Sequence, residues 1–333
     1  FRSFNMLKKP LFIDNLQYSN WSLEVFEQMR EANLTAVHVT ICYHENFRQT
    51  IGNIISWNKF IELHPDLLML ARNADDVRNA YKKNKTAIIF GFQNSSPIEE
   101  NIGLIEVFHK LGVRFMQLSY NNQSLLATGC YEETDPGVTR FGKQAIKEMN
   151  RVGLVIDVSH TSEKSSFDAI RYSERPIVIS HANPNWWHES KRNKSDALIQ
   201  EVTSNGGMIG FSIYPHHLKN GTNCTLESFS TMIAHSAEKY GVNNLGIGSD
   251  LCQNQPDSVV EWMRNGTWSK EMDYGEGTKD SAGFPIQPEW FKKTSDFPNL
   301  LVGLKKVGFN KEETSKIMGL NWLNFYEENF HAL

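Results

Sequence analysis

Eight short runs of β-branched and other apolar residues recur along the chain, separated by segments with helical periodicity. The runs lie near residues 10–16, 35–41, 86–92, 113–120, 153–160, 176–181, 206–213 and 245–250. The segments between them carry apolar residues three and four positions apart, which is the spacing of one helix face. Strands that alternate with helices in this way predict a parallel sheet covered by helices.

The number of repeats favours a single (β/α)8 barrel. Closing a parallel sheet removes both of its exposed edges. The 333 residues, 40% of them hydrophobic, are enough for one large α/β core. An open, doubly wound sheet is the main alternative, but no strand is followed by a GxGxxG turn or a GxxxxGK[ST] loop. We interpret the polar, aromatic-rich segment from about 252 to 298 as a loop excursion after the eighth strand.

We expect one domain over residues 6–333, and interpret residues 1–5 as an expression remnant or a trimmed N-terminus before Met6. The net charge of -4, without a basic stripe, argues against a nucleic-acid partner. No apolar run approaches the roughly 20 residues needed to cross a bilayer, so we expect no membrane association. The four cysteines are far apart and form no CxxC pair, which favours a reducing, cytoplasmic location.

Two of the apolar runs end in a histidine. GLVIDVSH ends at His160, PIVISH ends at His181, and LGIGSD, the last run, ends at Asp250. In a parallel barrel the carboxyl ends of all strands meet at one mouth, where enzymes of this fold place their chemistry. Two imidazoles and a carboxylate there are a reasonable ligand set for a divalent transition metal. The structural alternative is that the histidines bond to neighbouring carbonyls and that Asp250 caps the next helix.

Five blocks of sequence resemble landmarks of the membrane (renal) dipeptidase family, within the amidohydrolase superfamily. They are FGKQAIKEMNRVGLVIDVSH at 141–160, ISHANP at 179–184, RNKSD at 192–196, LGIGSD at 245–250 and IMGLNWLNFY at 317–326. The blocks occur in order and at suitable separations over essentially the whole chain. The resemblance implies a (β/α)8 barrel, a metal-dependent hydrolase ancestry, and small dipeptides or related amides as substrates.

The resemblance also implies roles for individual residues. His160 and His181 match the pair that holds one zinc ion, and Asp250 matches the residue that binds metal and handles the proton of the attacking water. Arg192 and Asn193 match a loop pair that holds the substrate's carboxylate. An arginine suits that task because its planar fork can form two hydrogen bonds with a carboxylate.

Four strand-end positions depart from the family pattern. Leu16 and Tyr18 stand where the family has the HxD pair of the first zinc. Gln93 replaces the bridging glutamate, and Tyr120 replaces a substrate-binding histidine. Only Asp250 remains of the matched carboxylates, so two divalent ions would keep most of their charge uncompensated in a partly dehydrated mouth. We therefore reject a two-metal site.

Our first hypothesis is a hydrolase with one divalent metal, expected to be zinc. His160 and His181 bind the ion, and Asp250 or the Gln93 oxygen and water complete the coordination. The metal activates water toward an amide carbonyl, and Asp250 accepts the proton.

The substrate side of this hypothesis uses residues of other strands and loops. Tyr120 or Tyr18 donates a hydrogen bond to the developing oxyanion, and Arg192 with Asn193 holds an anionic end of the substrate. A dipeptide, a small amide, an ester or an N-acyl compound is compatible with this site. The substrate, the metal and the oligomeric state, a homo-oligomer included, stay open.

The second hypothesis is a metal-free barrel that binds a small molecule without converting it. Aromatic residues near strand ends can form an apolar pocket, or a cage for a quaternary ammonium group. They are Tyr18, Trp21, Tyr43, Trp186, Trp187 and Tyr214. Metal content separates the two hypotheses.

Overall fold

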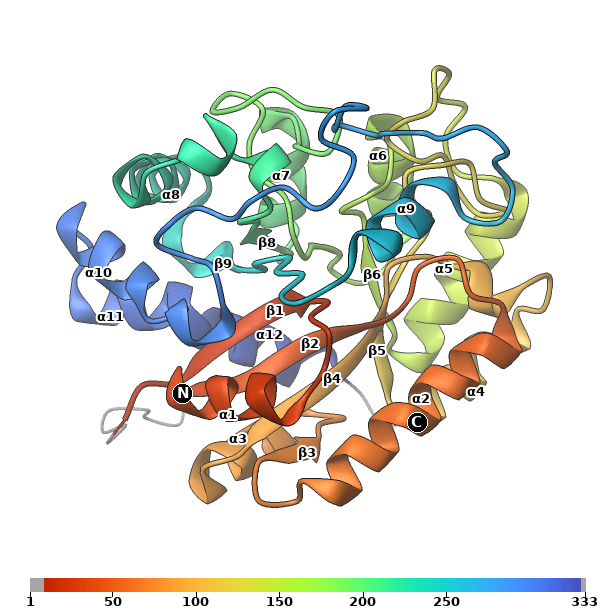
Figure 1. Ribbon diagram of the computed structural model, residues 1–333. Helices are drawn as coiled ribbons and strands as arrows, with labels where there is room; N and C mark the ends of the chain where they lie inside the picture. Colours follow the sequence, from red (N-terminus) through yellow and green to blue (C-terminus); the bar gives the residue numbers. More distant parts are fainter. Residues whose placement is uncertain (1–8, 331–333) are drawn as a thin grey trace.

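Eight parallel strands pair side by side in chain order in the computed structural model, which describes residues 9–330 (Figure 1). The strands are β1 (Phe12–Gln17), β2 (Leu34–Cys42), β4 (Thr86–Phe92), β5 (Val113–Gln117), β6 (Val155–Asp157), β7 (Val178–Ile179), β8 (Met208–Phe211) and β9 (Leu245–Ile247). The last strand returns to the first: the Tyr18 amide donates to the Leu251 carbonyl at 3.0 Å, and the Asp250 amide donates to the Leu16 carbonyl at 3.0 Å. The predicted (β/α)8 barrel and its eight strands are confirmed.

One further strand, β3 (Leu68–Leu70), was not predicted. It pairs in parallel with the start of β4 and lies outside the barrel path. Three residues are too few to give a periodic signal in the sequence. Residues 1–5 and the end of the chain at 331–333 lie outside the described residues.

Helices follow the strands and cover the outside of the barrel (Figure 1). Between the strands lie α1 (Leu23–Glu31), α2 (Phe47–Leu63), α3 (Ala74–Lys83), α4 (Gly103–Lys110), α5 (Arg140–Val152), α6 (Glu163–Tyr172), α7 (Asp196–Ser204) and α8 (Leu226–Tyr240). α5 shows why such segments form. Thr139 caps its first turn by accepting from the Gly142 amide at 2.9 Å, and Gly153 ends it with φ +82°. Its buried Ile146 and Met149 face the strands.

The end of the barrel opposite the mouth is closed by α12 (Asn321–Asn329). Trp322 and Tyr326 are fully buried and pack against strand residues on the inside of the barrel, among them Phe115 of β5. The Tyr326 hydroxyl also donates to the Asn15 side-chain oxygen at 2.5 Å. The C-terminal helix therefore completes the core.

The segment after β9 crosses the mouth. It contains α9 (Asp257–Asn265) and little other regular structure before α10 (Asn299–Lys306) and α11 (Lys311–Ser315). In Figure 1 α9 and the chain that follows it lie on the side of the barrel where the strands end. Within residues 9–330, no helix is both long and apolar enough to cross a bilayer, and the four cysteines are free.

Candidate active site

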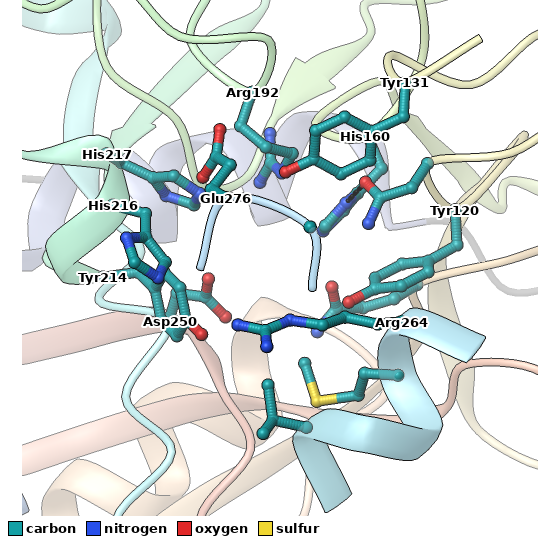
Figure 2. Close-up of a pocket in the computed structure, with 15 residues that line it drawn as sticks. Tyr120, Tyr131, His160, Arg192, Tyr214, His216, His217, Asp250, Arg264 and Glu276 are labelled. Atoms are coloured by element: carbon teal, nitrogen blue, oxygen red, sulfur yellow. Dashed lines mark hydrogen bonds between the residues drawn. The ribbon is translucent and has the colours of Figure 1, made fainter. Parts of the chain in front are cut away.

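A pocket opens where the strands end (Figure 2). Centres of water-sized molecules can occupy about 60 Å³ of it, which is room for a few ordered waters or a small polar ligand. The predicted residues in its wall are Gln93, Tyr120, His160, Arg192 and Asp250. The barrel thus brings together side chains that are more than 150 residues apart in the sequence.

His160 and His181 approach each other directly. Their Nε2 atoms are 3.0 Å apart, and both side chains are at most 5% exposed. Each histidine follows one of two adjacent strands, β6 and β7, which is why the rings meet. Glycines on the neighbouring strands permit this packing: a Cβ added at Gly210 or Gly248 would lie 2.1 or 1.8 Å from the Ser180 carbonyl oxygen.

Hydrogen bonds assign the same tautomer to both rings. The Nδ1 of His160 faces the side-chain oxygen of Asn121 at 2.6 Å, so it carries a proton. The Nδ1 of His181 lies 2.8 Å from the Ser180 hydroxyl, which itself donates to the Asp157 carboxylate. Because that hydroxyl has only one proton, its oxygen accepts from His181. Both Nε2 atoms are therefore unprotonated.

Two nitrogen lone pairs that face each other at this distance suit a shared cation. Burial lowers the pKa of both imidazoles well below the usual range, and Arg192 lowers them further, so a shared proton is disfavoured. Two nitrogen ligands of a tetrahedral zinc ion are about 3.3 Å apart, close to the 3.0 Å between His160 and His181. The donor pair fits a divalent metal ion, and Asn121 and Ser180 orient it as outer-shell partners do.

Asp250 lies in the same pocket but has no hydrogen-bond partner for its carboxylate among residues 9–330. Its φ of +56° is unusual for a residue with a side chain. Burial raises its pKa to about 7, the positive charge of Arg192 opposes this shift, and the charge of Asp14 adds to it. A carboxyl group that titrates near neutrality in a pocket is suited to accept and return a proton.

A third metal ligand is not preassembled. Within the described part of the chain, no three His, Cys, Asp or Glu side chains lie close enough together to hold an ion. Coordination by Asp250 or Gln93 therefore stays a prediction. The amide nitrogen of Gln93 donates to the Thr40 and Tyr43 hydroxyls at 2.8 and 3.1 Å, which fixes the direction of this side chain. Asp250 does not cap a helix either, since α9 begins only at Asp257.

The positions matched to the first zinc are filled by apolar and aromatic packing. Leu16 is fully buried. Tyr18 meets Tyr43 edge to face at a centroid distance of 4.8 Å, and Tyr43 meets Tyr120 in the same way at 4.9 Å. The Tyr120 ring lies 4.2 Å from the His160 ring. Such pairs stabilise by dispersion and quadrupole contacts and offer no metal ligand.

The structure gives Arg192 a different task from the predicted carboxylate clamp. One terminal nitrogen donates to the Ser159 carbonyl and the other donates to the His181 carbonyl at 3.0 Å. The guanidinium therefore ties together the two turns that carry the histidines. Its Nε is buried without a hydrogen-bond partner among residues 9–330, and the side chain is only 2% exposed.

Asn193 also has a structural task in this arrangement. Its amide nitrogen donates to the His188 and His217 carbonyls at 2.8 and 3.1 Å, and its oxygen accepts from the Asn183 amide at 2.9 Å. It is not part of the pocket wall. Both of its amide protons are used, so this conformation does not support the predicted contact with a substrate.

Only part of the predicted aromatic pocket forms. Tyr214 lines the pocket. The three tryptophans do not: Trp21 packs on Trp57, Trp187 packs on Phe229, and the indole of Trp186 donates to the Tyr240 hydroxyl at 2.9 Å. An aromatic cage built from these six side chains is therefore wrong.

The pocket also contains polar side chains that sequence reasoning did not single out. They are Asn121, Tyr131, His216, His217, Arg264 and Glu276. They lie in connections between the strands or, for Arg264, in the last turn of α9, where the strand pattern does not predict which way a side chain points. The adjacent histidines in YPHH at 214–217, just after a strand, were the one signal available.

Comparisons with known proteins show the family and the fold. The family model of membrane dipeptidase, peptidase family M19, matches residues 15–262. An amidohydrolase from Pseudomonas aeruginosa is 34% identical, with a TM-score of 0.91 over 96% of both chains. A metallo peptidase from Rhodobacter sphaeroides, liganded with a phosphinate mimic of the dipeptide L-Ala-D-Ala, shares the fold at 16% identity, with a TM-score of 0.78 over 96% of this chain and 99% of that one.

A curated relative gives the same family. Dipeptidase tcpJ of Claviceps purpurea is 26% identical over 289 residues, which are 86% of this chain and 61% of the relative. The chain thus spans less than two thirds of the relative's length. The family model covers most of the chain, including the strands that end in His160, His181 and Asp250. On this evidence the chain belongs to the membrane dipeptidase family.

Proposed function

We propose that this protein is a metal-dependent hydrolase that cleaves a dipeptide or a related small amide at a site with one metal ion. The observation that carries the proposal is the pair of unprotonated Nε2 atoms of His160 and His181, 3.0 Å apart. His160 and His181 would hold a divalent ion there, and the ion would supply the Lewis acidity that polarises a carbonyl group and makes water a nucleophile at neutral pH. Membership of a metallopeptidase family supports the metal dependence.

The count of one ion rests on charge. Leu16 and Tyr18 offer no anionic ligand, and the neutral amide of Gln93 cannot supply the charge of a bridging carboxylate. Among residues 9–330, no group of three His, Cys, Asp or Glu side chains replaces them on this side. One ion on the histidine pair needs far less compensation than two.

Asp250, Tyr120 and Arg192 supply proton transfer, oxyanion stabilisation and support of the histidine pair. Asp250 accepts a proton at its carboxylate from the attacking water, because its pKa of about 7 lets it exchange protons near neutrality. The Tyr120 ring lies beside His160 in the pocket wall, tilted by 34°, from where its hydroxyl donates to a developing oxyanion. Arg192 holds the two histidine turns in place and contributes positive charge to the site.

The substrate class follows from the size of the pocket and from the family. A pocket of this size admits a small polar molecule. The Rhodobacter neighbour was solved with a dipeptide mimic, and several curated relatives are dipeptidases. A dipeptide is therefore the first substrate to examine.

Hydrolysis by metal-loaded protein tests this function. We expect release of free amino acids from dipeptides after loading with Zn, Mn or Co, and loss of activity on chelation. His181→Ala should reduce hydrolysis to the level of the chelated protein, whereas His235→Ala, which changes an exposed histidine on α8, should not. Activity that survives both chelation and His181→Ala would refute the proposal.

The metal-free binding protein remains the second candidate. Its support is the aromatic packing of Tyr18, Tyr43 and Tyr120 together with the lack of a three-ligand cluster in residues 9–330. If the protein is a metal-free binding protein, small molecules bind as tightly after a chelator has removed the metal as they do to metal-loaded protein, and no substrate is turned over. Calorimetric titration with and without metal separates the two candidates.

A further inference from the structure

Two side chains of opposite charge reach the pocket from the segment after β9, and neither has a role in the hydrolysis proposed for this site. Arg264 is in the last turn of α9, and Glu276 follows in the irregular chain. Figure 2 shows both among the side chains that surround the pocket. They come from an element different from the strands that carry the histidines and Asp250.

Arg264 is held in place and still has hydrogen-bonding capacity. One terminal nitrogen donates to the Ala282 carbonyl at 2.6 Å. The side chain runs along a glycine stretch, where a Cβ added at Gly275 would be 3.3 Å from Nε and one added at Gly277 would be 3.1 Å from the other terminal nitrogen. Among residues 9–330 its remaining N–H groups have no hydrogen-bond partner. Arg192, in contrast, donates from both terminal nitrogens to the main chain.

Glu276 presents an unsatisfied acceptor. Its Oε1 is buried and has no hydrogen-bond partner in the described residues. Burial raises the pKa of this carboxyl group, while the positive charge of Arg192, the Tyr131 hydroxyl and Arg264 favour its ionised form. A buried carboxylate oxygen without a donor is unfavourable, and a ligand that brings an N–H group removes that cost.

The pocket wall carries ionisable side chains of both signs. Arg192 and Arg264 are cationic, and Asp250 and Glu276 are acidic. A wall of this kind does not select a purely anionic or a purely cationic molecule. It complements a ligand that carries both charges at separate ends.

We propose that Glu276 binds the ammonium group and Arg264 the carboxylate of a zwitterionic substrate, such as an unblocked dipeptide. The excursion after β9 then sets substrate specificity, in place of the loop with Arg192 and Asn193. This inference rests on the proposed function for turnover, but the binding that it describes does not require turnover.

Three probes test it on the metal-loaded protein: alanyl-alanine, its N-acetyl form and its C-terminal amide. Dissociation constants are measured by calorimetry, and KM where hydrolysis occurs. Glu276→Gln should weaken binding of alanyl-alanine and of the amide about tenfold to a hundredfold and leave the N-acetyl form unaffected. Arg264→Met should weaken alanyl-alanine and the N-acetyl form by a similar factor and leave the amide unaffected. Arg264→Lys should retain most of the binding.

Control measurements separate this inference from the proposed function. Thermal unfolding checks that the variants fold, and both changed residues lie in irregular or helix-end positions at the surface of the barrel. Discrimination by the probes without hydrolysis supports the inference and contradicts the proposed function. Hydrolysis with equal losses for all three probes overturns the inference alone. Failure of the wild type to bind any of the probes overturns the inference and also excludes alanyl-alanine as a substrate.

Discussion

The two sides of the barrel mouth differ in what their side chains do. The histidine side, at the ends of β6 and β7, consists of His160 and His181 with their hydrogen-bonded partners. The tyrosine side, at the ends of β1, β2 and β5, consists of Tyr18, Tyr43 and Tyr120, which contact each other edge to face. His160, His181, Tyr43 and Tyr120 are buried and Tyr18 is partly buried, so the two sides differ mainly in chemistry.

Metal binding at the mouth depends on donor atoms that point at the ion and on negative charge that compensates the ion. On the histidine side each Nδ1 atom is engaged, so each Nε2 atom points at its counterpart. On the tyrosine side the ring contacts stabilise the mouth without any cation. The histidine side therefore offers oriented nitrogen donors, whereas the tyrosine side is packed by aromatic contacts.

Asp250→Asn removes the proton acceptor that faces both sides. We expect kcat to fall about 10²- to 10⁴-fold. The fold should survive. Burial raises the pKa of the wild-type carboxyl group from 3.8 to about 7, so the folded state loses stability as the pH rises between these values, and the full loss is present at pH 8. A neutral amide removes this penalty. Steady-state kinetics and the midpoint of thermal unfolding at pH 8 measure the two effects. Unchanged kcat, or a large loss of stability, would contradict the assigned role.

Asn121→Gly weakens the histidine side without touching a ligand. Asn121 orients His160 through its Nδ1 atom at 2.6 Å and has φ +59°, which glycine tolerates. Loss of such an outer-shell partner typically costs 10- to 100-fold in metal affinity, and we expect about that loss here. Competition with a chromophoric chelator measures the affinity. Asn122→Gly is the matched control and should leave it unchanged; equal effects in both variants would remove the argument.

Gln93→Glu places a carboxylate next to the tyrosine side. The side chain is 2% exposed and is already fixed by the Thr40 and Tyr43 hydroxyls, both of which can donate to a carboxylate. We expect metal to bind about tenfold more tightly, because the new charge compensates the ion. Chelator competition measures this change in metal affinity. Binding of a second ion at high metal concentration raises the number of ions bound per chain. Weaker binding would show that Gln93 does not face the ion.

Tyr18→Leu should have the smallest effect. The edge-to-face contact with Tyr43 contributes about 1 kcal/mol to stability, and nothing in the charge argument requires the hydroxyl. We expect a loss of about that size in the free energy of unfolding and an unchanged metal affinity. Chemical denaturation and chelator competition measure these quantities. A marked loss of metal would mean that the tyrosine side takes part in coordination.

Much of the fold could be predicted from sequence because strands and helices have different periods. The eight barrel strands and the residues that end them follow from that periodicity, and so does the meeting of His160 and His181. β3 was missed because three residues show no period. The sequence could not predict that the guanidinium of Arg192 donates to main-chain carbonyl groups, because such hydrogen bonds depend on the conformations of loops.

The pocket wall was less predictable than the strand ends. Arg264 and Glu276 come from a segment with little regular structure, in which neither direction nor depth of a side chain follows from spacing. Asn193 matched a family position, but its hydrogen bonds place it in the support of the loop. Contacts between irregular segments, more than the barrel itself, decide which side chains reach a ligand.

The number of metal ions per chain tests the central claim most directly. Elemental analysis is made on protein purified without chelator, loaded with zinc and freed of excess metal, for the wild type and for His181→Ala. Our account predicts one ion per chain in the wild type and none in the variant, because the ion depends on the His160 and His181 pair. Two ions per chain in the wild type, none after loading, or one ion retained by His181→Ala would contradict it.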